Sequence, residues 1–268
     1  MKINIRPVGL LFVLCLLGGL LCSCGAIAES WNTVRLTGAA VTDTVVLEDC
    51  TDAIRLSVHL NFVNGGDNVI KVLPPPEGAE PYYEITYPAD FIERGLIAHY
   101  DDGCLTVEIV PSRQGQRQFS TDAFSMTVYA NVCDFDLVGS HTLRADHGGV
   151  AVPALNLHIT GGAAAEMSGI AAETVTVRVD GAADVVLAGT AGTLETELNG
   201  AAALESTRLA TQNAEITING VGAAEIACSE TLDAEINGAG SISYVGDPTV
   251  TKEINGAGAV SKRPDPQA

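Results

Sequence analysis

Two histidines and an aspartate lie close together in the chain, and their side chains are capable of acid–base chemistry. His141, Asp146 and His147 could supply a hydrolase triad if a distant serine served as the nucleophile. In α/β-hydrolases that serine sits on a sharp turn, yet no Gly-x-Ser-x-Gly segment occurs in the sequence. We therefore expect these three residues to form a solvated turn, and we assign no catalytic residues.

Three glutamates could serve a different chemistry, the binding of calcium. Glu166, Glu205 and Glu225 each follow a glycine by five residues, so the last two could stand on neighbouring strands. Ca²⁺ takes oxygen ligands and could bridge such carboxylates. The Gly-Gly-x-Gly-x-Asp repeat typical of calcium-binding β-helices is absent from the sequence. We expect a solvated acidic face, with no metal and no cofactor.

Four cysteines lie beyond residue 24, an even number that would suit an oxidising compartment. They are Cys50, Cys104, Cys133 and Cys228, and three disulfide pairings are possible. Buried thiols are the alternative. No Cys-x-x-Cys spacing occurs among them, which argues against a zinc site.

These candidates lie in or beside a repeat that dominates the second half of the chain. Each copy has an apolar residue, then a polar residue, then a glycine, and a small residue follows two positions beyond the glycine. The first copy departs from this pattern at the polar position and at the small position. Successive glycines are separated by 22, 20, 19, 20, 18 and 18 residues. We assign these seven as corner glycines: Gly139, Gly161, Gly181, Gly200, Gly220, Gly238 and Gly256.

The spacing of the glycines distinguishes two all-β folds. Asn-Gly pairs are typical of hairpin turns, but a meander has turns about every 8–12 residues. One glycine every 18–22 residues instead predicts a right-handed parallel β-helix, a solenoid with one such corner per coil. The apolar residue before each polar-glycine pair should form an inward column. A ladder of side-chain amides should form beside it, from Asn199, Asn219, Asn237 and Asn255.

Residues 33–134 alternate apolar and polar residues in short runs separated by turn signals. We predict a β-rich N-terminal region that caps the solenoid, because an uncapped end would expose strand edges. This region also holds a dense group of aromatic residues. They could form a sugar-stacking face, although the core of the capping sheet is the interpretation that we favour. The group comprises Tyr82, Tyr83, Tyr87, Phe91 and Tyr100.

The first residues predict export. Two bases precede an apolar run at residues 8–21, the layout of a secretory signal peptide. The run ends in Leu21-Cys22-Ser23-Cys24, which resembles a bacterial lipobox and would make Cys24 the lipidated N-terminus. Cleavage near Ala26 or Ala28 without lipidation is the alternative. Removal of residues 1–23 leaves 12 bases against 33 acids, a net charge of −21, which argues against nucleic acid as a partner.

The repeat also carries a family resemblance. Ile-Asn-Gly-Ala-Gly-Ser-Ile at 236–242, its echo at 254–260, and Asp101-Asp102-Gly103-Cys104-Leu105-Thr106-Val107 look like the head GIN domain family of putative auto-transporter adhesins. The likeness covers roughly residues 33–262, although the copies at 161, 181 and 200 carry alanine in place of the second glycine. The resemblance implies a β-helical envelope protein without enzyme activity or a defined cofactor.

Together these features predict five segments. They are a signal peptide at 1–23, a lipid-anchored tether at 24–32, the capping region at 33–134, the glycine-repeat β-helix at 135–262 and a tail at 263–268. We expect a non-enzymatic envelope lipoprotein, facing the periplasm or the cell surface, whose rigid acidic solenoid contacts an envelope or surface protein or glycan. The alternative is a carbohydrate-active β-helix enzyme. Residues 157–260 hold only three bases and one aromatic residue, which is a poor supply for such a site.

Overall fold

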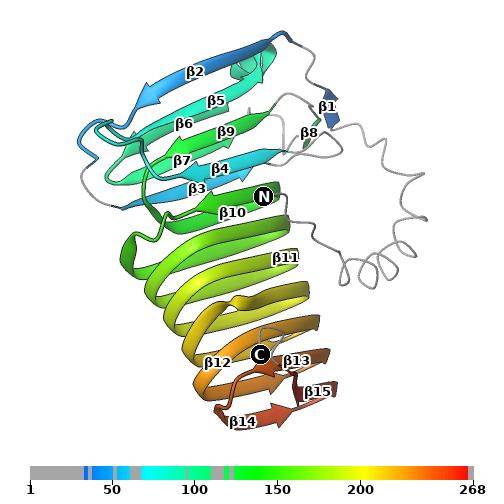
Figure 1. Cartoon of the computed structure of the whole chain (residues 1–268). Coiled ribbons are helices and arrows are strands. Elements are labelled where there is room, and N and C mark those ends of the chain that lie inside the picture. The colour runs from blue at the N-terminus through cyan, green and yellow to red at the C-terminus, as the bar shows by residue number, and fades with distance from the viewer. Residues whose placement is uncertain are drawn as a thin grey trace.

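The computed structural model of the chain describes residues 33–35, 38–50, 53–60, 68–94, 96–109, 118–120 and 124–264. The fold is all-β, built around one large, mostly parallel sheet (Figure 1). Its elements are β1 (Thr33–Arg35), β2 (Ala40–Val46), β3 (Ile54–Leu60), β4 (Val69–Leu73), β5 (Tyr82–Pro88), the 3₁₀-helix η1 (Ala89–Arg94), β6 (Leu96–Asp101), β7 (Cys104–Ile109), β8 (Gln118–Ser120), β9 (Ser125–Tyr129), β10 (Val132–Asp146), β11 (Ala151–Ile218), β12 (Val221–Ile236), β13 (Ala239–Val245), β14 (Thr249–Ile254) and β15 (Ala257–Lys262).

The glycine repeats pair with one another in parallel register. Gly139 of β10 lies opposite Gly161 of β11, and Ile218 of β11 lies opposite Ile236 of β12. Figure 1 shows the long strand β11 bending repeatedly, so that later stretches of the chain lie beside earlier ones. An antiparallel meander is thereby excluded for these repeats, because neighbouring copies run in the same direction.

The core of the repeats is built from columns of equivalent apolar residues. Side chains alternate between the two faces of a strand, so every second residue points inward. The predicted inward column is confirmed. Its members are 0–1% exposed except the last, Ile254, which is 38% exposed at the end of the stack: Leu137, Ile159, Val179, Leu198, Ile218, Ile236 and Ile254.

The strands of the N-terminal region extend the stack of repeats at one end and then cap it. Strand β3 pairs in parallel with both β10 and β7, and β4 pairs in parallel with both β10 and β9. Strand β3 therefore lies between β7 and β10, and β4 lies between β9 and β10, out of sequence order. Strands β2, β5 and β6 pair antiparallel at the end of the stack, and β1 pairs with β8 in a separate parallel sheet of two strands. The predicted boundary between residues 134 and 135 falls inside β10.

The aromatic residues of this region mostly belong to its core. Tyr83, Tyr87 and Phe91 are at most 4% exposed, which agrees with the core interpretation and removes them from any sugar-stacking face. Tyr82 stacks on Tyr129 with ring centroids 4.4 Å apart. The end of the stack is thus packed by side chains that the small residues of the repeats do not provide.

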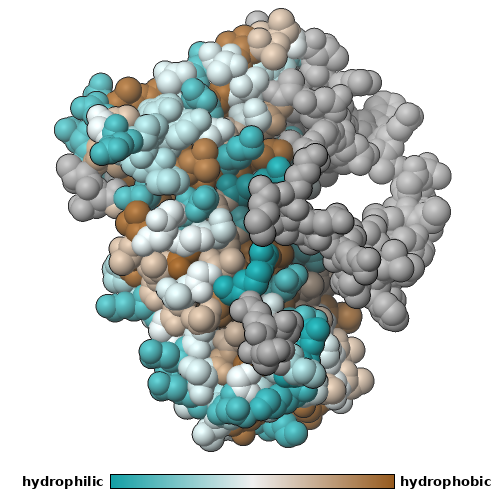
Figure 2. All heavy atoms as spheres, viewed as in Figure 1, coloured by the Kyte–Doolittle hydropathy of each residue, from teal (hydrophilic) through white to brown (hydrophobic). Residues whose placement is uncertain are grey.

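Figure 2 shows hydrophilic residues mixed with residues of intermediate and high hydropathy along the visible face, with hydrophobic residues also reaching the surface near the end where β2 lies. Across the described ranges, no helix has the length and apolar character needed to cross a membrane.

Candidate functional site

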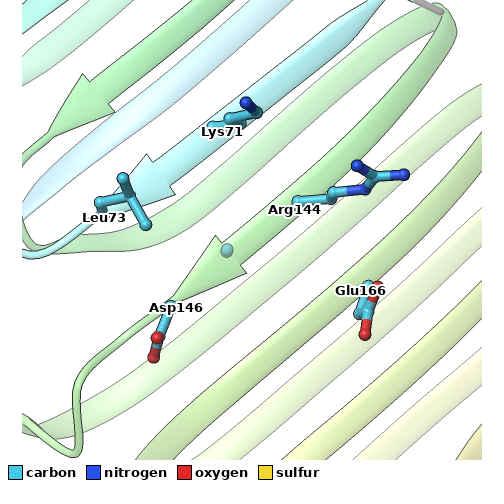
Figure 3. Close-up of a pocket in the computed structure, with 6 residues that line it drawn as sticks. Lys71, Leu73, Arg144, Asp146 and Glu166 are labelled. Carbon is cyan, nitrogen blue, oxygen red and sulfur yellow. The ribbon is translucent and has the colours of Figure 1, made fainter. Parts of the chain in front are cut away.

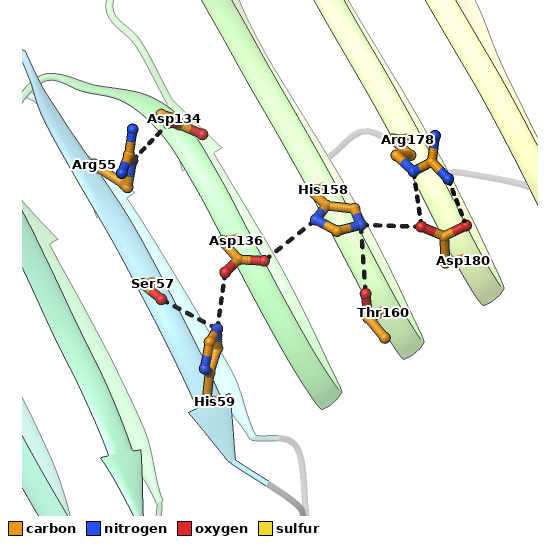
Figure 4. Close-up of polar contacts among 9 residues, drawn as sticks. All are labelled: Arg55, Ser57, His59, Asp134, Asp136, His158, Thr160, Arg178 and Asp180. Atoms are coloured by element: carbon orange, nitrogen blue, oxygen red, sulfur yellow. Dashed lines mark hydrogen bonds and ion pairs between the residues drawn. The ribbon is translucent and has the colours of Figure 1, made fainter.

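The most extensive polar arrangement lies on one outward face, formed by β3, the first half of β10 and the equivalent stretches of β11, β12 and β14. We call it the ladder face. Its first rung is the ion pair between Arg55 Nε and Asp134 Oδ2, 2.8 Å apart. Its second rung joins His59 Nε2 to Asp136 Oδ2, also at 2.8 Å (Figure 4). Both rungs exist because β3 lies directly against β10.

The row continues through His158, which bridges two aspartates. Its Nδ1 lies 3.4 Å from Asp136 Oδ1, and its Nε2 lies 3.1 Å from Asp180 Oδ2. Figure 4 shows the imidazole of His158 between the two carboxylates, of which Asp136 belongs to β10 and Asp180 to a later stretch of β11. Aspartates and histidines therefore alternate across the sheet and contact one another in this half of the ladder face.

Asp180 is the most strongly perturbed carboxyl group of the row. Hydrogen bonds from Arg178, Asn199 and His158 lower its pKa to about 2, with Arg178 the largest contributor. Arg178 Nε donates to Asp180 at 2.8 Å, and the same guanidinium contacts Glu197. These side chains are 32–46% exposed, so solvent screening keeps the stabilisation small.

Beyond Asp180 the row becomes the predicted asparagine ladder, which is confirmed. Each amide nitrogen donates to the preceding amide oxygen at 2.9–3.0 Å, from Asn219 to Asn199, from Asn237 to Asn219 and from Asn255 to Asn237. Glu235 and Glu253 also accept from the asparagine two positions later in their own strands.

This second half of the ladder face is acidic. Glu215 lies opposite Asp233, and Glu235 lies opposite Glu253. Within the part of the chain that the structure describes, none of these four carboxylates forms an ion pair. Unneutralised carboxylates on adjacent strands repel each other, and a cationic partner would relieve that repulsion.

A small pocket lies on another outward face. It has a volume of about 140 Å³ and is lined by Lys71, Leu73, Arg144, Ala145, Asp146 and Glu166. Figure 3 shows these side chains spread over β4, β10 and β11 rather than converging on one point. Pockets for small ligands are commonly about 300 Å³ or larger, so this one does not suggest an enclosed binding site.

The seven predicted corner glycines form one column with a common steric constraint. A Cβ on any of them would lie 2.0–2.4 Å from the carbonyl oxygen of the residue stacked before it. That residue is Leu60 for Gly139 and the preceding glycine for the other six. Gly139, Gly161, Gly181 and Gly200 also have φ between +118° and +158°. Close backbone approach therefore requires glycine throughout the column.

The candidate triad is not assembled. His141 is only 4% exposed, and its Nε2 donates to the carbonyl oxygen of Val138 at 2.9 Å. Asp146 instead accepts a hydrogen bond from the N–H of Gly148 at 3.0 Å. The expectation of a solvated turn is wrong for His141, whose pKa is lowered by burial. His147 is partly buried with its ring edge-on to Phe135, and burial lowers its pKa as well.

The three glutamates are placed partly as expected. Glu205 and Glu225 lie opposite each other on β11 and β12, whereas Glu166 lies opposite Arg144. Glu225 forms an ion pair with Arg263. Among the residues whose positions are described, no group of three or more histidine, cysteine, aspartate or glutamate side chains is arranged to hold a metal ion.

Three of the cysteines can be placed as thiols. Cys104, Cys133 and Cys228 form no disulfide in the described structure. Cys228 is buried, and its thiol donates to the carbonyl oxygens of Gln212 and Thr231. Burial raises the pKa of Cys133 and of Cys228. Cys50 packs partly buried against the core, and Cys24 lies outside the described residues.

A mostly parallel sheet of stacked glycine repeats, closed at one end by antiparallel strands, defines the structural class of this protein. The chain belongs to the family described as putative auto-transporter adhesin, head GIN domain, whose model matches residues 93–248. The sequence resemblance is thereby confirmed. No curated protein matches the chain.

Solved structures show the same fold at low sequence identity. A putative adhesin from Bacteroides fragilis superposes with a TM-score of 0.65 at 18% identity, covering 86% of this chain and 100% of that one. A putative lipid binding protein from Parabacteroides distasonis gives a TM-score of 0.58 at 16% identity, with 87% and 100% coverage. A putative adhesin from the same organism gives a TM-score of 0.55 at 15% identity, with 86% and 100% coverage.

Proposed function

We propose that this protein is a non-enzymatic lipoprotein of the bacterial cell envelope that presents a rigid, acidic β-solenoid for adhesion. The solenoid is a right-handed parallel β-helix of 18–22 residues per coil, and Cys24 carries the lipid that holds it to the membrane. Its partner is a protein or glycan of the envelope or of an opposing surface. Membership of a family named for adhesion supports this function.

The observation that carries the proposal is the ladder face. It extends from β3 to β14 without interruption, and its side chains bind their neighbours rather than converging on one point. Catalysis needs an acid, a base and a nucleophile held together. A repetitive row of carboxylates and amides instead suits contact distributed over a long surface.

The enzyme alternative has no comparable support. It needed a cleft lined by Tyr82, Tyr87 and acids, but Tyr87 is 4% exposed and Tyr82 is stacked on Tyr129. The phenol of Tyr87 donates to Asp43, which together with burial raises its pKa to about 12. A phenol so held is a poor general base at neutral pH.

The test compares two faces of the same protein. The acylated chain serves as bait for the native envelope, and captured proteins and glycans are quantified. Neutralising the acidic half of the ladder face by Glu215→Gln, Asp233→Asn and Glu253→Gln, singly and then together, should weaken capture in proportion to the number of changes. The matched control is Glu166→Gln with Glu205→Gln on the other face. Equal loss in the control set, or turnover of an envelope polysaccharide by the purified protein, would overturn the proposal.

A further inference from the structure

Among the described residues, the strands at the two ends of the stack each leave one edge without a paired strand. Strands β2 and β15 terminate one path through the large sheet. Strands β6 and β14 each pair on one side only, with β7 and β12 respectively, among the described residues. Figure 1 places β2 at one end of the molecule and β14 and β15 at the other. Unpaired edges are templates for further strands, so proteins usually protect them.

Both ends carry a charge where an apolar residue is expected. Asp43 of β2 lies opposite Ile85, which is 3% exposed, so this carboxylate stands in an inward-facing row. At the other end, Lys252 of β14 lies opposite Ala234, which is fully buried. Lys262 of β15 lies opposite Tyr244, in the column that begins at the buried Ile226. At these inward positions one end therefore presents an acid, which accepts a hydrogen bond from Tyr87, and the other end presents two bases, of which Lys262 forms an ion pair with Asp247.

These charges discriminate between possible pairings. Contact between two identical ends would place Asp43 against its copy, or the lysines against theirs, and like charges brought together are costly. Contact between opposite ends brings Asp43 of β2 into line with Lys262 of β15, because β2 and β15 end the same path through the sheet, and it places Lys252 of β14 in line with β6. It would also cover apolar side chains that are unusually exposed at the two ends, Val41 and Val45 at 36% and 41%, and Ile254 at 38%.

Strand direction is compatible with the same contact. Strand β2 runs antiparallel to β5, and β5 runs antiparallel to β9, so β2 has the direction of the repeat strands. The chain of parallel pairings from β9 through β4, β10, β11, β12 and β13 ends at β15. A β2 strand placed beside β15 of another copy would therefore continue a parallel ladder.

We propose that copies of this chain associate head to tail, with the β2–β6 end of one copy stacked on the β14–β15 end of the next. Such a contact joins two different surfaces and does not close on itself, so it generates chains of copies rather than a dimer. The partner is a second copy of this protein, selected by opposite charge at the inward positions of the edge strands. Such an association would place the ladder faces of successive copies in one continuous row. It does not depend on which partner the ladder face binds.

Charge reversal tests the contact from both sides. The full chain, extracted in mild detergent, is measured by sedimentation velocity over a wide concentration range at low and high salt. Wild type should form dimers and longer species, most strongly at low salt. Asp43→Lys alone, and the pair Lys252→Glu with Lys262→Glu alone, should each lower the association constant at least about tenfold. An equimolar mixture of the two variants should restore association, because opposite charges then meet again.

Glu205→Lys is the matched control for Asp43→Lys, because it makes the same change in net charge on an exposed site in the middle of the stack. It should associate like wild type. The association constants are compared only for variants whose thermal midpoint equals that of wild type, which shows that they are folded. If Asp43→Lys does not fold, the Lys252→Glu and Lys262→Glu pair tests the same contact. Wild type that remains monomeric throughout, or a mixture that stays as weak as its components, would overturn the proposal.

Discussion

Two adjacent glycines allow the corner column to be tested within a single repeat. Gly161 belongs to the column: a Cβ there would lie 2.4 Å from the carbonyl oxygen of Gly139, and its φ is +118°. Gly162 follows directly, but a Cβ there would meet nothing closer than the carbonyl oxygen of Ala182 at 3.9 Å. Later repeats already carry alanine at its equivalent positions, 182 and 201.

The expected magnitudes follow from these contacts. Gly161→Ala must part strands that are normally about 4.8 Å apart. Overpacking costs about 1–3 kcal/mol, and an L-residue at positive φ costs about 1–3 kcal/mol more. We therefore expect Gly161→Ala to lose roughly 2–6 kcal/mol of stability, which lowers the Tm by about 5–20 °C for a chain of this size. Gly162→Ala should stay within about 1 kcal/mol of wild type, on the stabilising side.

A third variant separates the steric cause from the conformational one. Gly238 has no positive φ, yet a Cβ there would lie 2.1 Å from the carbonyl oxygen of Gly220, which accepts the N–H of Ala239 at 2.9 Å. Gly238→Ala should therefore also be strongly destabilising. Thermal unfolding followed by circular dichroism measures all three variants. If Gly161→Ala melts with wild type, or if Gly162→Ala melts as early as Gly161→Ala, the steric account of the column is wrong.

Further predictions concern the core, pH and the anchor. Ile236→Asp should cost several kcal/mol because it places an unpaired charge in the inward column, whereas Glu225→Ala should shift the denaturant midpoint little; equal shifts would contradict the assignment of faces. Because burial holds the pKa of His141 below its ordinary value, the unfolded chain takes up the proton first, so stability should fall as the pH drops below about 6.5. His141→Gln should flatten that part of the pH profile, and an unchanged slope would refute the role of His141. Because the pKa of Asp180 is held at about 2, its carboxylate stabilises the folded chain above about pH 4, and this stability should be lost between about pH 4 and 2. Asp180→Asn should therefore show a smaller decrease in stability over this acid range than wild type. Labelled palmitate should enter wild type but not Cys24→Ser, and persistence of label and membrane association in that variant would exclude Cys24 as the anchor.

The repeats could be predicted from the sequence because the residues of each copy contact the equivalent residues of the next copy along the chain. Each copy touches the copy about 20 residues away, so the residues that stack are also the residues that align. Gly220 lies on Gly200, and Asn237 donates to Asn219, as the alignment of copies requires. The contact between His158 and Asp180 was not predictable in this way, because His158 lies three residues before its corner glycine and Asp180 lies only one residue before its own.

The first half of the ladder face could not be predicted in this way. Arg55 meets Asp134 and His59 meets Asp136 across 79 and 77 residues, because β3 inserts between β7 and β10 out of sequence order. Val63-Asn64-Gly65 has the apolar–polar–glycine order of a repeat, but it precedes Gly139 by 74 residues, so the spacing of 18–22 residues does not mark it as the neighbouring copy. The place of β3 and β4 depends on the fit of their apolar face to the stack, which is a tertiary property.

Departures from the repeat turn out to have a structural counterpart. Where the corner glycine has a positive φ, at 161, 181 and 200, alanine occupies the second small position. From Gly220 onward the corner glycine has no positive φ, and the second small residue is also glycine. A Cβ on Gly240 would lie 2.6 Å from the carbonyl oxygen of Gly222 and 3.4 Å from Cγ2 of Ile218.

In the copies from Gly220 onward, the changed conformation of the corner glycine therefore leaves no room for a Cβ at the second small position. Glycine is required there, and alanine would not fit. His141 occupies the same position in the first copy, where the corner at Gly139 has a positive φ and the imidazole is buried against the turn. Histidine, alanine and glycine at this one position thus follow from the space that each corner leaves inside the stack. Because His141 is a polar residue in a column of small residues, the sequence predicted a solvated turn. The geometry of the corner instead places His141 in the core.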